Sequence, residues 1–285
     1  MKWTAGDRGN VEDVRGHGGG MRMGGLGLGG LLLALVLSWA TGVDFLSLLG
    51  GSDTISTSPT GTSGGGEVAT TPEEERMIDF VDAVMNDAQQ MWQQQLPGKY
   101  QATRARIFRD QVESACGFAQ SATGPFYCPA DQMVYLDLGF FKELHERFRA
   151  PGDFAQAYVL AHELGHHVQH LLGVDSQVRR AQQQRPDQAN PLSVRLELQA
   201  DCLAGIWGRQ AAQQGRAAQG KVELEPGDVE EGLNAAASIG DDRLQRMAGA
   251  RVAPDRFTHG SSEQRVAWFR RGLESGNIQA CDTFK

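Results

Sequence analysis

The sequence contains no long cluster of lysine and arginine, and its 27 basic residues are outnumbered by 35 acidic ones among 285 residues. The resulting net charge of -8 is opposite to what a phosphate-binding surface requires. The composition therefore argues against nucleic acid as a main partner. The chain also has no internal repeat, and its length is sufficient for one large domain or two small ones.

Cysteine is scarce, because the chain has only Cys116, Cys128, Cys202 and Cys281. None of them forms a C-x-x-C pair, so a zinc site built on cysteine is disfavoured. An even number of cysteines in an exported protein favours disulfides. Of the three possible connectivities we favour Cys116 with Cys128, closing a short turn-rich loop, and Cys202 with Cys281, tying the C-terminal tail to a central helix.

Long apolar runs are also scarce, and the one candidate for a transmembrane helix covers residues 24–49. Its charge-free part, Gly24 to Gly42, would extend about 28 Å as a helix, close to the roughly 30 Å hydrocarbon core. Three arginines precede it and two aspartates follow it, which predicts a short cytoplasmic N-terminus (residues 1–23) before a signal anchor. The alternative is a cleaved signal peptide, with small residues at 38–42. With either a signal anchor or a cleaved signal peptide, we expect the chain after residue 50 to lie outside the cytoplasm.

Residues 50–70 are rich in glycine, serine and threonine and predict a flexible linker. Residues 71–285 are expected to form the main domain, which begins with a helix capped by Thr71. We expect one strand, Met133 to Asp137, then a helix from near Gly139. Longer helices are predicted over residues 154–172, 190–213, 226–238 and 261–274. The predicted fold class is α+β and mainly helical, with a small sheet.

The motif His162-Glu163-Leu164-Gly165-His166 lies in the predicted helix 154–172. Residues four apart share one helix face, so both imidazoles can reach one metal ion. Glu163 then lies beside the metal, where it can act as a general base. The pattern is the H-E-x-x-H signature of zinc hydrolases, and it predicts one Zn²⁺ per chain.

Two imidazoles are too few for a lasting catalytic zinc site, which usually has three protein ligands. The helix 190–213 carries Glu197 and Asp201 four residues apart. We expect Glu197 to be the third ligand and Asp201 to accept the second ring N–H of a ligand histidine. The alternative is a solvated acidic face, but apolar neighbours argue against it. His167 and His170 are interpreted as supporting or surface residues.

His259 stands just before the last helix, beyond the residues that cap it. A hydrolase of this kind needs a donor for the developing oxyanion, and His259 is our first candidate. Tyr127 and Tyr135 are the others. A purely structural histidine remains the alternative reading.

The sequence resembles the bacterial predicted neutral zinc metallopeptidases, a gluzincin-like, membrane-anchored family. The resemblance covers nearly all of residues 73–285 and implies a zincin-like, minimal gluzincin domain after one N-terminal transmembrane helix. It also implies zinc on His162, His166 and Glu197, with Asp201 orienting a ligand. By analogy, the strand Met133 to Asp137 is expected to be the edge along which a peptide binds. The residues that carry the resemblance are CG with GPFYCPAD and VYLDL (116–138), AHELGHHVQ (161–169), RLELQADCLAG (195–205), IGDD (239–242), THGSSEQR (258–265) and ACDTF (280–284).

We therefore expect a single-pass membrane protein whose extracytoplasmic domain is a zinc endopeptidase, with Glu163 activating the attacking water. Its expected partners are a peptide or protein substrate and the membrane. Two alternatives remain open at this stage. One is a non-catalytic, zinc-stabilised module that binds envelope partners, and the other is a zinc amidase acting on a non-protein amide.

Overall fold

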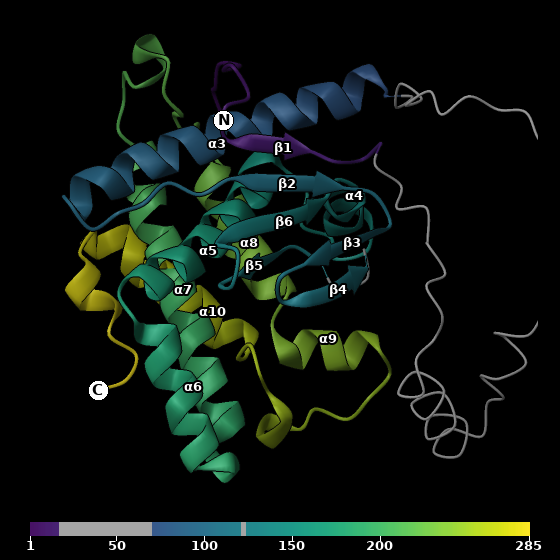
Figure 1. Ribbon diagram of the computed structural model, residues 1–285, viewed down its shortest axis with the longest axis vertical. Helices are drawn as coiled ribbons and strands as arrows, with labels where there is room; N and C mark the ends of the chain where they lie inside the picture. Colours follow the sequence, from purple (N-terminus) through teal and green to yellow (C-terminus); the bar gives the residue numbers. More distant parts are fainter. Residues whose placement is uncertain (17–69, 121–123) are drawn as a thin grey trace, which may run out of the picture. The chain divides into compact units, whose positions relative to one another are not determined.

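The computed structural model describes residues 1–16, 70–120 and 124–285 (Figure 1). Met1–Arg15 and Ala69–Lys285 form one compact unit. The predicted transmembrane segment, residues 24–49, and the predicted linker up to residue 69 lie outside the described residues. Within the described ranges, no helix is both long and apolar enough to cross a membrane.

The main sheet has four strands in the order β1 (Val11–Asp13), β2 (Ala105–Phe108), β6 (Met133–Asp137) and β5 (Phe126–Cys128). The first three are parallel, and β5 runs antiparallel to β6. A separate hairpin pairs β3 (Gln111–Ser114) with β4 (Gly117–Gln120). The strand predicted at Met133 to Asp137 is confirmed, but its expected place at the sheet edge is wrong, because β6 lies between β2 and β5. The two edge strands are β1, which contacts α3 (Pro72–Gln95), and β5, which contacts α5 (Asp153–Leu171).

Helices make up most of the rest of the described chain, as the predicted mainly helical α+β class requires. α5 passes beside the sheet and contacts α3, α7 and α8, while α7 and α10 pack closely together (Figure 1). The α-helices are α3 (Pro72–Gln95), α4 (Gly139–Glu146), α5 (Asp153–Leu171), α6 (Val174–Gln184), α7 (Ala189–Ala211), α8 (Asp228–Ser238), α9 (Asp241–Met247) and α10 (Ser262–Ser275). The 3-10 turns are η2 (Pro186–Gln188), η3 (Ala217–Gln219), η4 (Pro254–Arg256) and η5 (Ile278–Cys281).

The start of α3 follows from its sequence. The Thr71 hydroxyl accepts a hydrogen bond from the backbone N–H of Glu74 at 3.2 Å, and the Glu74 carboxylate accepts one from the backbone N–H of Thr71 at 3.0 Å. This reciprocal cap satisfies donors that the first turn would otherwise leave unpaired. The inner face of α3 then buries apolar side chains, among them Ile78, Val81 and Trp92, in the core. The predicted first helix of the domain is confirmed.

Both predicted disulfides are present. Cys116 pairs with Cys128 across 12 residues, and Cys202 pairs with Cys281 across 79 residues. The second bond joins α7 to the C-terminal η5. Beside it, Gly205 of α7 and Gly272 of α10 bring the two helix backbones into direct contact, since an added Cβ at either glycine would overlap backbone atoms of the other helix.

The folded unit starts earlier than the sequence predicted. Residues 1–15, expected as part of a separate N-terminal tail, belong to the same unit as the domain and supply strand β1. Lys2 and Glu223 also exchange two backbone hydrogen bonds, at 2.8 and 3.0 Å. The domain therefore consists of residues 1–15 together with the region from about residue 70 to the C-terminus.

Candidate metal and catalytic site

The candidate site forms where α5 crosses α7, and Gly165 permits the close approach. A Cβ at this position would lie 3.0 Å from the Ala200 carbonyl oxygen and 3.1 Å from the Ala200 Cα. Any side chain here would therefore press on the α7 backbone. The glycine inside the His-Glu-x-x-His motif thus brings the histidine face of α5 against the turn of α7 that carries Glu197.

The structure brings His162, His166 and Glu197 together, as the sequence predicted. One donor atom from each lies within 4.8 Å of the others. The Nε2 atom of His162 is 3.1 Å from Glu197 Oε2, and Nε2 of His166 is 3.5 Å from Oε1 of the same carboxylate. Two imidazoles and one carboxylate are a donor set used by catalytic zinc sites, which keep a fourth position open.

The second ring nitrogen of each histidine is held by an acceptor. His162 Nδ1 lies 2.9 Å from Asp201 Oδ1, and His166 Nδ1 lies 2.8 Å from Gln169 Oε1. An Nδ1–H that donates to such an acceptor leaves the Nε2 lone pair free to bind a metal. The Gln169 amide is fixed in turn, because it donates to the Leu196 carbonyl at 2.7 Å. The residues present therefore fit a zinc ion at the three inward-facing donors.

Asp201 is fully buried and is the centre of a charged network. Nε and Nη2 of Arg265 each donate to it at 2.9 Å, and the Tyr158 hydroxyl donates to the same carboxylate. Burying an aspartate is unfavourable unless a positive charge and hydrogen bonds compensate, and Arg265 of α10 supplies both. The network joins α5, α7 and α10 directly behind His162.

The charges of the site attract positive charge to the two Nε2 atoms. Burial lowers the pKa of His162, yet Asp201 and Glu197 outweigh burial and raise it to about 10. Burial raises the pKa of Glu197, but His166 and His162 outweigh it and hold this pKa well below its usual value. Glu197 is therefore an anion that faces both imidazoles. A zinc ion bound here would supply the positive charge in place of protons.

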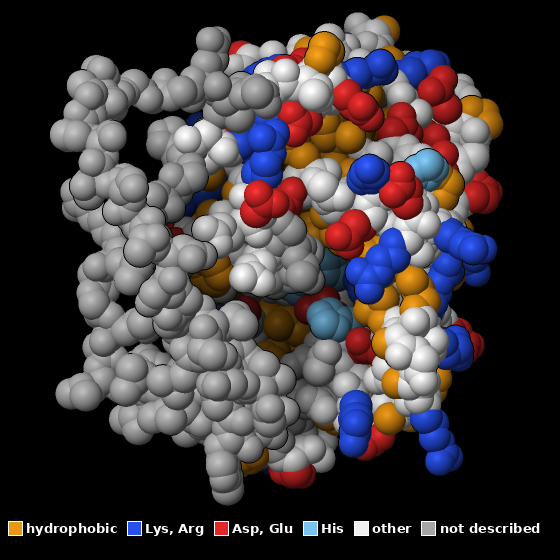
Figure 2. All heavy atoms as spheres, turned by 90° about the vertical axis from the view of Figure 1, so that its right-hand side faces the viewer, with side chains coloured by type: hydrophobic (Ala, Val, Ile, Leu, Met, Phe, Trp, Pro, Cys, Tyr) orange, Lys and Arg blue, Asp and Glu red, His pale blue; other side chains and the backbone are white. Residues whose placement is uncertain are grey.

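Glu163 lies beside this group and lines a cavity of about 590 Å³ together with all three candidate ligands. Its side chain is 7% exposed, and burial raises the pKa of its carboxyl group. A raised pKa makes the carboxylate a stronger base toward water. Figure 2 shows hydrophobic and histidine side chains together in a hollow of the surface.

His259 also lines the cavity, and Asp241 fixes it. One carboxylate oxygen of Asp241 accepts the backbone N–H groups of Thr258, His259 and Gly260 at 2.7, 2.7 and 3.0 Å. The other lies 3.3 Å from His259 Nδ1. The hydrogen bond with Asp241 raises the pKa of His259, although burial opposes it. The ring is half-exposed, and its Nε2 is not engaged by Asp241.

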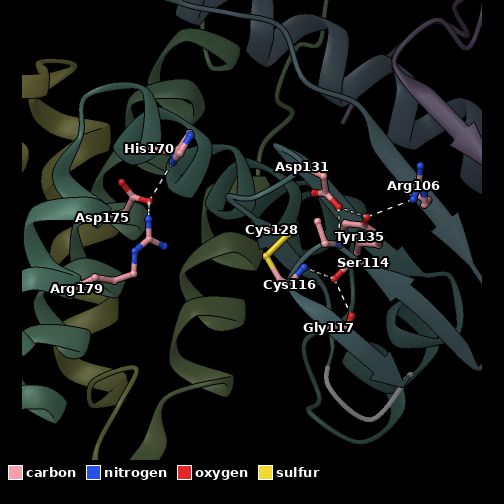
Figure 3. The surroundings of a disulfide bond; sticks show 11 residues. Arg106, Ser114, Cys116, Gly117, Cys128, Asp131, Tyr135, His170, Asp175 and Arg179 are labelled. Atoms are coloured by element: carbon pink, nitrogen blue, oxygen red, sulfur yellow. Dashed lines mark hydrogen bonds and ion pairs between the residues drawn. A yellow bond between two sulfur atoms is a disulfide. The ribbon is translucent and has the colours of Figure 1, made fainter. Parts of the chain in front are cut away.

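Of the two tyrosines considered as oxyanion donors, one lines the cavity and the other does not. Tyr127 lines the cavity, but its hydroxyl lies 2.9 Å from Nδ1 of His167. Tyr135 is not at the site, because its ring is buried against Phe126 and its hydroxyl donates to Asp131 (Figure 3). The prediction of Tyr135 as an oxyanion donor is therefore wrong.

The two extra histidines of α5 lie outside the ligand group. His167 is fully buried and its Nε2 is 2.7 Å from the Gln101 carbonyl, so it links α5 to the chain before β2. His170 pairs with Asp175 at 3.0 Å, and Asp175 in turn accepts from Arg179 (Figure 3). Both histidines stabilise the surroundings of the site.

Four residues of the site were not predicted from the sequence: Tyr158, Arg265, Asp241 and Gln169. Arg265 and Asp241 are within the motifs THGSSEQR and IGDD, so the signal was present without an assigned role. Gln169 ends the motif AHELGHHVQ, and its position three residues after His166 places both residues on one helix face.

Comparison with known proteins agrees with this geometry. A family model described as "Putative neutral zinc metallopeptidase" matches residues 1–284. The chain is 44% identical over 297 residues to "Uncharacterized protein YpfJ" of Escherichia coli K12, covering 100% of this chain and 99% of the relative. It is 45% identical over 208 residues to "Uncharacterized protein Rv2575" of Mycobacterium tuberculosis H37Rv, and the match covers 72% of this chain and 69% of the relative. No solved structure matches. The chain belongs to the neutral zinc metallopeptidase family.

Proposed function

We propose that this protein is a zinc-dependent endopeptidase. The observation that carries the proposal is that His162, His166 and Glu197 converge on one side of a cavity that Glu163 also lines. The family supports zinc and peptidase chemistry. The endopeptidase activity, the roles of individual residues and the location are our own extensions.

His162, His166 and Glu197 would hold the zinc ion, which when bound supplies a Lewis acid for water and for the substrate carbonyl. Glu163 takes a proton from the attacking water and later gives it to the leaving amine. Burial raises the pKa of Glu163, which makes its carboxylate a better acceptor for the proton of the attacking water. His259 donates from Nε2 to the oxygen that becomes negative as the carbonyl is attacked.

The edge of the sheet offers a way to hold an extended peptide. β5 is the last strand of the main sheet, and the segment Gly124 to Tyr127 lines the cavity. A substrate backbone can pair with the outer edge of β5, while its scissile carbonyl faces Glu163. This assigns to β5 the role that the sequence suggested for Met133 to Asp137. Backbone N-methylation of a cleaved peptide should then raise KM, whereas an unchanged KM would argue against strand pairing.

The two disulfides support an oxidising compartment for the domain. We propose that the protein acts outside the cytoplasm and is attached to the membrane by the apolar residues 24–49. The bond between Cys202 and Cys281 ties the C-terminal η5 to α7, the helix that carries Glu197.

The proposal is tested by peptide cleavage with the purified full-length protein in detergent. A mixed peptide library is incubated with the enzyme and the products are read by mass spectrometry. We expect internal cleavages that a chelator abolishes and added zinc restores. Zinc binding without any turnover would instead favour a binding module, and cleavage only of non-protein amides would favour an amidase.

A further inference from the structure

Residues 1–15, which we call the N-terminal arm, complete the domain. Strand β1 of the arm pairs in parallel with β2, and Figure 1 shows it between α3 and β2. Trp3 packs edge-on against Phe80 of α3, with ring centroids 5.6 Å apart. Val11 is buried in the main core. Both the sheet and α3 are therefore covered by the arm.

Two buried polar groups of α3 depend on the arm. The Asp82 carboxylate is 1% exposed, and within the described chain it accepts hydrogen bonds from the backbone N–H groups of Arg8 and Asn10 and from the Asn10 side chain, at 2.9 to 3.2 Å. The buried Gln89 donates to the same asparagine at 2.8 Å. The arm therefore covers this carboxylate and also supplies the hydrogen-bond donors that its burial requires. The sequence of α3 is therefore suited to a docked arm.

The arm ends where α3 begins. The guanidinium of Arg15 is buried and lies 3.5 Å from Glu74 and 3.1 Å from Glu75, both in the first turn of α3. The chain thus leaves the folded unit after Arg15 and re-enters it just before Thr71, at neighbouring points. Residues 24–49, with their apolar run, lie between these two points in the sequence.

We propose that the N-terminal arm and the domain lie on the same side of the membrane, because they form one folded unit. The hydrocarbon core is about 30 Å thick. A single crossing would place the arm and α3 on opposite faces, and none of the arm's hydrogen bonds to α3 and β2 could form. The geometry therefore replaces the arrangement predicted from the arginines, with a cytoplasmic N-terminus and an external domain.

Sidedness is tested with single cysteines added to the full-length protein in intact cells. Ala5→Cys places a thiol on the exposed surface of the arm, and Glu263→Cys places one on the exposed start of α10. A membrane-impermeant maleimide is added before and after permeabilisation, with the unsubstituted protein as the control. We expect both thiols to react at the same stage. One thiol reacting only in intact cells while the other requires permeabilisation would overturn the proposal.

Docking itself is tested with the pair Glu12→Cys and Arg106→Cys. These residues face each other in the β1–β2 register, and their side chains are 3.0 Å apart. A protease site is inserted within residues 51–66, and membranes are treated with copper phenanthroline. After cleavage, the arm should stay bound to the domain until reductant is added. Release without reductant, or a cross-linked dimer, would contradict docking within one chain, and each single variant controls for unrelated disulfides.

Discussion

Asp201→Asn is the perturbation that most fully probes the network behind His162. Asp201 is fully buried, and its carboxylate accepts from Tyr158, twice from Arg265, and from His162. Losing its charge leaves the buried Arg265 guanidinium without its main counterion. Breaking a buried ion pair in this way costs about 3–5 kcal/mol. The orientation of His162 is also weakened, which costs about 10–100-fold in metal affinity.

The assay combines urea unfolding of the metal-free protein with zinc titration against a competing chelator. Asp255→Asn, on an exposed 3-10 turn, is the matched control and should change neither quantity. The double variant Asp201→Asn with Arg265→Gln removes both charges, so it should recover much of the stability but not the zinc affinity. Equal unfolding midpoints and equal zinc affinities for Asp201→Asn and the unsubstituted protein would refute the reasoning.

Three further predictions follow from other parts of the structure. Gly165→Val should push α5 away from the Ala200 backbone of α7 and lower the free energy of unfolding by about 1–3 kcal/mol. It should also weaken zinc binding in the chelator titration. Full retention of zinc affinity would contradict the helix-crossing argument. Asp241→Asn should lower the raised pKa of His259. Protonated His259 is lost as pH rises through this pKa, so the alkaline limb of the pH profile of kcat/KM should move to lower pH. An alkaline limb that does not move would remove His259 from the mechanism. Replacing Cys202 and Cys281 by serine should lower the free energy of unfolding, measured by calorimetry, by about 4 kcal/mol. The loss should exceed that for Cys116 and Cys128, because the second disulfide closes a loop of 79 residues and the first a loop of 12. The reverse order would contradict the loop argument.

Much of the site was predictable because its residues follow local rules. The i,i+4 spacing of His162 and His166, and of Glu197 and Asp201, fixes which side chains share a helix face. When α5 packs against α7, the polar residues on the two facing surfaces come into contact. In the structure His162 contacts both Glu197 and Asp201. Asp241 gave no comparable local signal, because its partner His259 lies 18 residues further along the chain.

The fold was predictable where periodicity was strong. α3, α4, α5, α7, α8 and α10 match expected helices, whereas α6 was missed because only Asp175 and Val178 in it are buried. The short strands β1 to β5 were missed because three or four residues give little alternation.

The sequence did not predict that the N-terminal arm is part of the folded unit. Arg8 and Arg15 were counted as charges that hold the N-terminus in the cytoplasm. In the structure, Arg8 pairs with Glu75 and Asp79 at 2.6 Å, and Arg15 pairs with Asp13 at 2.8 Å. The partners of Arg8 lie 67 and 71 positions further along the chain, so the sequence alone does not show that this arginine is paired.

The most direct test of zinc-dependent hydrolysis compares the initial rate of peptide cleavage by the unsubstituted protein and by Glu163→Gln, with zinc content measured on the same samples. We expect both proteins to bind one zinc ion per chain and Glu163→Gln to lose at least about 10²-fold in rate, as removal of a general base does. His166→Ala should lose both zinc and activity. A Glu163→Gln protein that binds zinc and cleaves peptides at the unsubstituted rate would contradict the account.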